Sequence, residues 1–152
     1  MKRAGPESIA ILVRFMAEAY AGADYTLDVP FAEKAFSTLL ADERLGYVWL
    51  LEDEGRDAGY VVLTLRFGME YGGMMACLDD LYVVPQSRNR GLSTRALQHI
   101  AEFCKSVGIR AITVEVAYGN TPAQTVYRRL GMVEAPDRQL LVLALASPSH
   151  VV

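Results

Sequence analysis

One segment constrains the fold of this chain more than any other, because residues 78–93 combine a strand, a basic loop and a helix start. The run from Leu78 to Val84 favours a β-strand, and Pro85 ends it because proline has no amide proton for a ladder. Beyond Gly91, apolar residues recur at helical spacing and predict a helix with one apolar face: Leu92, Ala96, Leu97, Ile100, Ala101, Cys104 and Val107. The loop therefore opens onto a helix N-terminus, where unpaired amides and the helix dipole favour an anion.

The loop itself resembles the hallmark of the GNAT-type N-acetyltransferase superfamily. That hallmark is a strand, then Q/R-x-x-G-x-G/A, then a helix, with loop amides holding the pyrophosphate of acetyl-coenzyme A. Arg88-Asn89-Arg90-Gly91-Leu92-Ser93 matches the first two fixed positions, and Ser93 takes the place of the last small residue. The alternative is an ordinary strand-loop-helix connection with two solvated arginines.

A second segment, residues 120–132, resembles the later motif of the same superfamily. That motif is N-x-x-A-x-x-x-Y followed by a basic residue, leucine, glycine and usually an aromatic residue, which is Met132 here. The two motifs occur in the expected order, joined by one helix and one strand. The resemblance covers roughly residues 47–145, and it identifies the chain as a member of this superfamily.

Length and composition favour one compact domain over residues 1–152, with 52% hydrophobic and 22% charged residues. No apolar run reaches the roughly 18 residues of a membrane span, and the start lacks a signal peptide's apolar stretch, so we expect a cytoplasmic protein. The net charge of −3 argues against nucleic-acid binding and suits a cationic small substrate. Cys77 and Cys104 fit reduced core thiols, and with only His99 and His150 beside them we expect no metal site.

Periodicity predicts the remaining elements. An amphipathic helix from Ile9 to Tyr20, with Pro6 in its first turn, precedes a loop over residues 21–29 and a second helix that begins at Pro30. A short helix capped by Thr121, with Gln124 at its third position, ends at Gly131. The predicted strands are a short edge strand at residues 1–4, a hairpin at 47–51 and 59–67, then 74–83, 111–116 and a last apolar strand at 139–146, before a frayed tail at 147–152.

The resemblance implies an α/β (α+β) fold of the acyl-CoA N-acyltransferase type. We expect a mixed, mostly antiparallel sheet of six or seven strands with helices on both faces. The strands around Val83 and Val116 should be neighbours that run parallel and splay apart, with acetyl-CoA in the splay. An exposed final strand could also join two copies as a homodimer through the sheet edge.

Acetyl transfer to an amine requires a base for the amine proton, stabilisation of the oxyanion and an acid for the departing thiolate. The resemblance assigns the acid to Tyr127. Acidic residues in apolar strands are candidate bases, and Glu115, acting through water with help from Asp79, matches base positions in the superfamily. Regular alternation places Asp79 on the face of Leu81, with Asp80 opposite. The alternatives are a carboxylate at a strand end or in an ion pair, and a core aromatic role for Tyr127.

The resemblance also implies the acetyl-CoA contacts. Backbone groups of Leu81, Tyr82 and Val83 would pair with the pantetheine arm and the thioester oxygen. Asn120 and Tyr127 would lie near the thioester. The pyrophosphate would be held by the loop residues Arg88, Asn89, Arg90, Gly91, Leu92, Ser93 and Thr94.

The acceptor is predicted from acids and aromatics that suit a cation. Candidate lining residues lie between the first two helices and in a strand connection: Tyr20, Asp24, Tyr25 and Asp28, with Met69, Glu70 and Tyr71. We therefore predict a small primary amine, with a protein N-terminus as the second choice. A module that senses acyl-CoA without turning it over is the alternative from another class.

Overall fold

A twisted sheet forms the centre of the computed structural model, which describes residues 1–146 and 150–151. Its strand order is β1-β3-β4-β5-β6, with β1 (Lys2–Arg3), β3 (Gly46–Asp53), β4 (Arg56–Gly68), β5 (Gly73–Val83) and β6 (Ile112–Val114). Every neighbouring pair is antiparallel except β5 and β6, which run parallel as predicted. The edge strand near the start, the hairpin and the parallel pair are confirmed.

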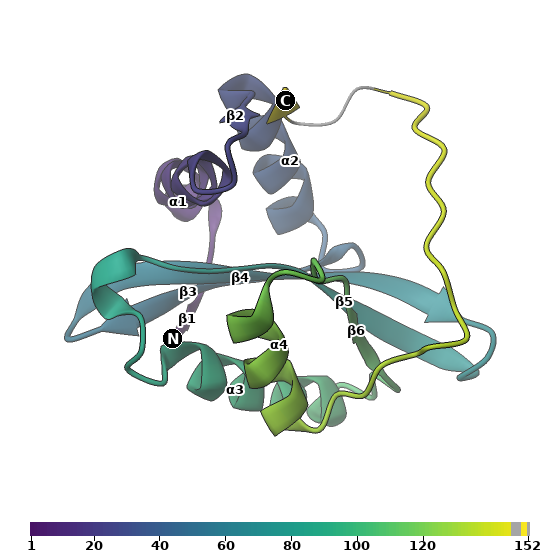
Figure 1. The fold of residues 1–152 in the computed structure, drawn as a ribbon. Helices are drawn as coiled ribbons and strands as arrows, with labels where there is room; N and C mark the ends of the chain where they lie inside the picture. Colours follow the sequence, from purple (N-terminus) through teal and green to yellow (C-terminus); the bar gives the residue numbers. More distant parts are fainter. Residues whose placement is uncertain (147–149, 152) are drawn as a thin grey trace.

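Helices cover both faces of this sheet (Figure 1). The helices α1 (Ile9–Ala21) and α2 (Val29–Ala41) lie on one face, and α3 (Leu92–Ser106) and α4 (Thr121–Leu130) lie on the other. Two short 3₁₀ turns, η1 (Pro6–Ser8) and η2 (Pro85–Ser87), precede α1 and α3. Pro6 thus starts η1 instead of the first turn of α1 that we expected.

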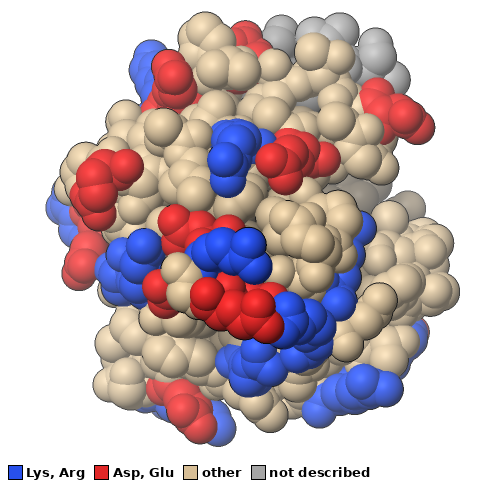
Figure 2. Space-filling model, turned by 90° about the vertical axis from the view of Figure 1, so that its left-hand side faces the viewer, with Lys and Arg blue, Asp and Glu red and all other residues tan. Residues whose placement is uncertain are grey.

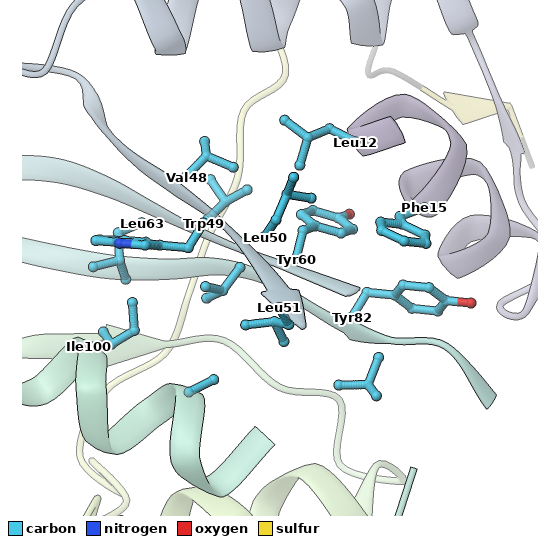
Figure 3. Packing of buried hydrophobic residues seen from close by; sticks show 14 of the residues in the cluster. Leu12, Phe15, Val48, Trp49, Leu50, Leu51, Tyr60, Leu63, Tyr82 and Ile100 are labelled. Carbon is cyan, nitrogen blue, oxygen red and sulfur yellow. The ribbon is translucent and has the colours of Figure 1, made fainter. Parts of the chain in front are cut away.

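The core on the α1 side is aromatic. The ring of Phe15 lies parallel to that of Tyr60, with 6.5 Å between the centroids, and 6.1 Å from the ring of Tyr82 (Figure 3). Phe36 of α2 meets Tyr60 edge-on. On the other face, α3 buries the apolar residues predicted from its periodicity: Leu92, Ala96, Leu97, Ile100 and Cys104. Burial of this apolar surface on both faces holds β4 and β5 in a fixed position.

Two helix caps position later parts of the site. Asp28 is the N-cap of α2, and its carboxylate accepts a hydrogen bond from the amide of Phe31. The helix therefore begins at Val29, one residue before the predicted start at Pro30. Asn120 is the N-cap of α4, where its side chain accepts from the amide of Ala123. The prediction that Thr121 caps α4 is therefore wrong by one residue, because the amide oxygen of Asn120 reaches the helix first. Gly131 ends α4 in the left-handed conformation, as expected.

A β-bulge interrupts the pairing of β4 with β5. Val62 faces Asp80 and Leu63 faces Leu78, so Asp79 is an extra residue without a partner opposite. Regular alternation across Asp79 does not hold, because the extra residue changes which side chains share a face. Asp80 shares the α1 face with Tyr82, whose cross-strand partner is Tyr60.

The predicted last strand at 139–146 is wrong for the described chain. These residues belong to no strand, and the large apolar side chains among them are 61–91% exposed: Leu140, Leu141, Val142, Leu143 and Leu145. The central sheet therefore has five described strands instead of six or seven. Inside the predicted loop, β2 (Thr26–Leu27) pairs instead with β7 (His150–Val151) as a separate ribbon. The rest of the predicted frayed tail, residues 147–149 and 152, lies outside the described residues.

Candidate active site

The strands β5 and β6 separate where the cofactor groove was predicted. Their ladder runs only from Ala76 opposite Ile112 to Leu78 opposite Val114. Beyond this point β5 continues for five residues to Val83 without pairing to β6. The backbone of Leu81, Tyr82 and Val83 is thus paired with β4 on one side and faces the splay on the other. An extended ligand can use these groups as a strand would.

The loop between β5 and α3 has the geometry of an anion site. Asn89 and Gly91 adopt positive φ angles of 59° and 74°. Gly91 is the N-cap of α3 and has no side chain to cap the helix, and the first turn carries no acidic residue. The first amide that bonds back within α3 is that of Arg95, to the carbonyl of Gly91 at 3.0 Å. The amides of Leu92, Ser93 and Thr94 precede it, so their N–H groups fit a pyrophosphate.

The loop arginines already have partners within the chain. Arg90 donates to Asp53 at 2.7 Å and to Glu54 at 2.6 Å, and the bond to Glu54 is the main cause that raises its pKa. Arg88 donates through Nε to the carbonyl of Val83 at 2.9 Å. Figure 2 views this side of the molecule and shows basic and acidic side chains interleaved, without a single large basic patch. The loop amides are therefore better placed than the arginine side chains to hold the anion.

A hollow of about 200 Å³ lies between α3 and α4. It is lined by residues of both helices: Thr94, Leu97, Gln98, Val126, Arg129 and Leu130. Thr94 belongs both to this hollow and to the predicted pyrophosphate loop. The cofactor groove can therefore continue from the loop into the space between the two helices.

Asp80 is a partly buried acidic residue on the part of β5 that lies beyond its pairing with β6. The phenol of Tyr60 donates a hydrogen bond to its Oδ2 at 3.1 Å. Burial raises the pKa of the Asp80 carboxyl to about 6, and this bond partly offsets the effect. Asp80 is one of the acids in apolar strands, but the sequence assigns the base to Glu115 and Asp79, because the bulge at Asp79 has no turn or glycine signal in the sequence.

The predicted bases lie nearby in more exposed positions. Asp79 is exposed in the bulge, although partial burial of its carboxyl raises its pKa, and Glu115 is exposed just after β6. Both carboxylates influence the thiol of Cys77. Burial is the main cause that raises the pKa of this thiol, and the charges of Asp79 and Glu115 raise it further. The structure thus brings Asp79 and Glu115 to the same part of β5 and β6.

Tyr127 of α4 interacts electrostatically with Asp80 of β5. Tyr127 packs against the hydrophobic core, and burial is the main cause that raises its pKa. The charge of Asp80 raises the pKa of Tyr127 further. The hydroxyl of Tyr127 therefore stays protonated at neutral pH, and its pKa responds to the charge of Asp80. Asn120 lies about two helical turns before Tyr127, at the start of α4, where its side-chain oxygen caps the helix.

Comparison with known proteins agrees with this geometry. Residues 12–132 match the sequence profile described as the Acetyltransferase (GNAT) family. The chain belongs to this family. The acetyltransferase is thus an enzyme that uses acetyl-CoA to acetylate an amine, and the fold and superfamily predicted from the two motifs are confirmed.

Individual relatives of the acetyltransferase are more distant in sequence than in fold. An integron cassette protein from the mobile metagenome of Cole Harbour Salt Marsh is 39% identical, with a TM-score of 0.89 over 97% of this chain and 91% of that one. The uncharacterised N-acetyltransferase YhfO of Bacillus subtilis is 26% identical over 66% of this chain and 68% of its own length. The thialysine N-ε-acetyltransferase of Mus musculus is 26% identical over 51% of this chain and about half (49%) of its own length.

The acceptor residues predicted for the acetyltransferase fall into two groups. Tyr20 and Tyr25 meet edge-on, with 6.4 Å between the ring centroids, and Tyr20 is close enough to Tyr60 to influence its pKa. Asp24 lies in the same connection, with a positive φ angle of 62°, whereas Asp28 caps α2. This first group therefore places its aromatic rings on the face of the sheet that carries Asp80.

The second group lies elsewhere on the acetyltransferase. Glu70 and Tyr71 occupy the turn between β4 and β5, and Glu70 is held by both guanidinium nitrogens of Arg138 at 2.8 and 2.7 Å. Asp80 is seven residues along β5 from Gly73, a distance of roughly 23 Å at the rise of a strand. The structure therefore does not bring Met69, Glu70 and Tyr71 together with Asp80. Glu18, which accepts from the Tyr82 phenol at 3.0 Å, was not predicted and lies on the same face as Asp80.

Among the described residues, no helix is both long and apolar enough to cross a membrane. The same residues contain no group of three His, Cys, Asp or Glu side chains that could hold a metal ion.

Proposed function

We propose that this acetyltransferase transfers an acetyl group from acetyl-CoA to the primary amine of a small cationic molecule, with Asp80 as the base and Tyr127 as the acid. The observation that carries the proposal is the pair formed by Tyr60 and Asp80 at the bulge. The bond from the phenol and partial desolvation leave Asp80 with a pKa of about 6. A carboxylate of that pKa is deprotonated at neutral pH yet basic enough to accept a proton from an amine that attacks.

The reaction balances with these two groups. The amine nitrogen bonds to the thioester carbonyl carbon, and the bond from that carbon to sulfur breaks. Asp80 accepts the proton that the amine releases, and the Tyr127 hydroxyl gives its proton to the departing sulfur. The products are an N-acetylated amine and coenzyme A with a free thiol. Solvent then returns the two side chains to their starting protonation states.

Acetyl-CoA itself would lie along the splay. The backbone of Leu81, Tyr82 and Val83, which does not pair with β6, is suited to the pantetheine arm, and the amides of Leu92, Ser93 and Thr94 are suited to the pyrophosphate. Asp79 and Glu115, beside Cys77, are suited to pass the accepted proton onward to water. This assignment gives the two carboxylates predicted from the sequence a relay role behind Asp80.

The acceptor is inferred from the α1 face. Glu18 and Asp80 supply carboxylates there, and Tyr20 and the mostly buried Tyr82 supply aromatic rings, whereas the ring of Tyr60 is fully buried. A protonated amine approaching this corner meets opposite charge and ring faces, which both attract cations. A small diamine or amino sugar fits this description better than an anionic or neutral acceptor. A protein N-terminus is the second candidate.

The test is release of free thiol from acetyl-CoA with a panel of cationic, neutral and anionic amines. Asp80→Asn should lower turnover with the best cationic amine by roughly 10²- to 10⁴-fold, the usual contribution of one general base. The matched control is Asp79→Asn, a change of the same kind one residue away, which should lower turnover far less. A larger loss in Asp79→Asn or Glu115→Gln than in Asp80→Asn would assign the base to that residue instead.

The same panel separates the enzyme from a sensor and sets the acceptor class. Tight binding of acetyl-CoA with no thiol release on any amine would contradict the enzymatic role. A preference for anionic or neutral amines would reject the cationic acceptor and leave the transferase activity standing.

A further inference from the structure

The turn between β3 and β4 lies beside the loop that precedes α3, at one end of the sheet (Figure 1). Arg90 of the loop donates through one guanidinium nitrogen to Asp53 at 2.7 Å and through the other to Glu54 at 2.6 Å. These partners lie 37 and 36 positions away in the chain and outside both sequence motifs. We call Asp53, Glu54 and Arg90 the hairpin clamp. It joins a turn without an assigned role to the proposed pyrophosphate loop.

The hairpin side of the clamp is rigid. Asp53 ends β3 and pairs in register with Arg56 of β4. Glu54 and Gly55 between them form a tight two-residue turn, with positive φ angles of 51° and 75°. A positive φ is uncommon for glutamate, and such a conformation persists only where surrounding contacts hold it. The side chain of Asp53 is 12% exposed and that of Glu54 is 62% exposed, so water competes less for the bond between Asp53 and the guanidinium.

On the loop side, the clamp holds the residue between two sharp bends. Arg90 lies between Asn89 and Gly91, which adopt positive φ angles of 59° and 74°. The carbonyl of Arg90 accepts a hydrogen bond from a guanidinium nitrogen of Arg95 in α3 at 3.0 Å. Arg90 is therefore held through its side chain by the hairpin and through its backbone by the helix. Both contacts fix the peptide groups directly before Leu92, the first residue of α3.

The charges of the clamp argue against a direct bond from the Arg90 side chain to phosphate. Two carboxylates face one guanidinium, so the clamp as a whole carries net negative charge and does not attract a pyrophosphate. Its contribution to cofactor binding is then geometric. An arginine released from its carboxylates would instead be a phosphate ligand in its own right. The two roles predict opposite effects of removing Asp53, weaker binding in the first case and tighter binding in the second.

We infer that Asp53 is a positioning residue, which acts through Arg90 to hold the loop amides in the conformation that binds the pyrophosphate of acetyl-CoA. Binding groups that are fixed in advance raise affinity, because the cost of ordering them is not paid when the ligand binds. The clamp therefore acts on cofactor affinity and not on the chemical step. This inference rests on the proposed pyrophosphate site, and it does not depend on the acceptor or on the base.

The test compares the wild-type chain with Asp53→Ala. Calorimetric titration of coenzyme A, which needs no acceptor amine, should show an affinity about three- to tenfold weaker in the variant. KM for acetyl-CoA should rise by a similar factor while kcat changes little, because binding is weakened and the chemical step is not. S-acetylpantetheine has the same thioester and arm but lacks the pyrophosphate. Its kcat/KM should therefore stay at the wild-type value in Asp53→Ala.

Two further variants connect this effect to the clamp. The double variant Asp53→Ala with Arg90→Ala should bind coenzyme A as Arg90→Ala alone does, because Asp53 acts through Arg90. The matched control is Asp57→Ala, which removes another carboxylate of the same hairpin, paired with Lys2 at 3.3 Å. It should leave the affinity for coenzyme A unchanged. Losses that simply add in the double variant would show that Asp53 acts independently of Arg90 and would overturn the inference.

The remaining outcomes separate the clamp from the site that it supports. Tighter binding of coenzyme A in Asp53→Ala would show that Asp53 withholds Arg90 from the phosphates. An equal loss of kcat/KM with S-acetylpantetheine would show general damage to the fold, and either result would overturn the positioning role. Weaker binding in Gly91→Ala together with wild-type binding in Asp53→Ala would overturn that role and leave the proposed pyrophosphate site standing. Wild-type binding in both variants would overturn both proposals.

Discussion

The phenol of Tyr60 on β4 donates to the carboxylate of Asp80 on β5 at 3.1 Å, one residue past the bulge at Asp79. The two residues lie on the face of the sheet that packs against α1, where Phe15 fixes the ring of Tyr60. Desolvation raises the pKa of Asp80, and the bond from Tyr60 lowers it. The pair therefore sets the proton affinity of the group that we assign as the base.

Removing the Tyr60 hydroxyl should move the pH dependence of turnover. In Tyr60→Phe the carboxylate of Asp80 loses the bond that favours its charged form, so its pKa should rise above about 6. The acidic limb of kcat/KM should shift upward by about one pH unit, with rates close to wild type well above that limb. Tyr82→Phe is the control, because its phenol bonds to Glu18, and it should leave the limb in place. An equal shift in both variants would show that the acidic limb of kcat/KM does not report the ionisation of Asp80.

Asp80→Asn should stabilise the fold at neutral pH although it lowers turnover. The folded pKa of about 6 lies above the ordinary value of 3.8, so the folded state binds the proton more tightly than the unfolded state. Asp80 therefore favours folding below its unfolded pKa, and that contribution is lost as pH rises through about 6. Above that pH the variant should gain about 1–3 kcal/mol in free energy of unfolding. Urea titrations from pH 4 to 8 measure this, and a gain of the same size at the acidic end would contradict the linkage.

Much of the fold followed from sequence because its signals are local. Helical spacing in α1 and α3, the proline that ends β5 and the polar turn between β3 and β4 each act over a few residues. The apolar run at 139–146 also predicts a strand by its composition, but in the structure it forms none. Composition alone misled here, because strand formation depends on long-range pairing, and among the described residues this run pairs with no strand.

Sequence predicted the parts of the site in which backbone groups would bind the cofactor. It predicted less well the parts in which a side chain would act. The loop before α3 and the unpaired stretch of β5 lie where expected because their positions depend on chain order. The base depends on which face a carboxylate occupies, and one extra residue at Asp79 changes that face. The ion pairs of Arg90 with Asp53 and Glu54 join residues far apart in the chain, so no local pattern revealed them.

Tyr127→Phe should separate chemistry from binding. The change removes one oxygen from a side chain that packs against the core, so the fold and the affinity for acetyl-CoA should change little. Turnover should fall by roughly 10²- to 10⁴-fold, because the departing sulfur loses its proton donor. Steady-state kinetics together with calorimetric titration of coenzyme A measure the two effects. The control is Tyr118→Phe at a fully exposed position, which should keep wild-type turnover. Wild-type turnover in Tyr127→Phe would show that Tyr127 is not the acid.

Gly91→Ala should weaken acetyl-CoA binding through the backbone of the loop. Gly91 has φ of 74° at the N-cap of α3, a conformation that costs an L-residue roughly 1–2 kcal/mol. Relief of this strain would turn the amides of Leu92 and Ser93 away from the pyrophosphate. KM for acetyl-CoA should therefore rise by about tenfold or more, because each 1.4 kcal/mol is a factor of ten in binding.

The control for this prediction is Gly108→Ala, since Gly108 has a similar φ of 78° after the opposite end of α3. An added Cβ meets no atom within 4 Å at Gly108, so the strain of the backbone is the effect that the two variants share. Both variants should lose similar stability in urea unfolding, and only Gly91→Ala should raise KM for acetyl-CoA. If both variants raised KM equally, the effect would come from general destabilisation, and the loop amides would not be the pyrophosphate site.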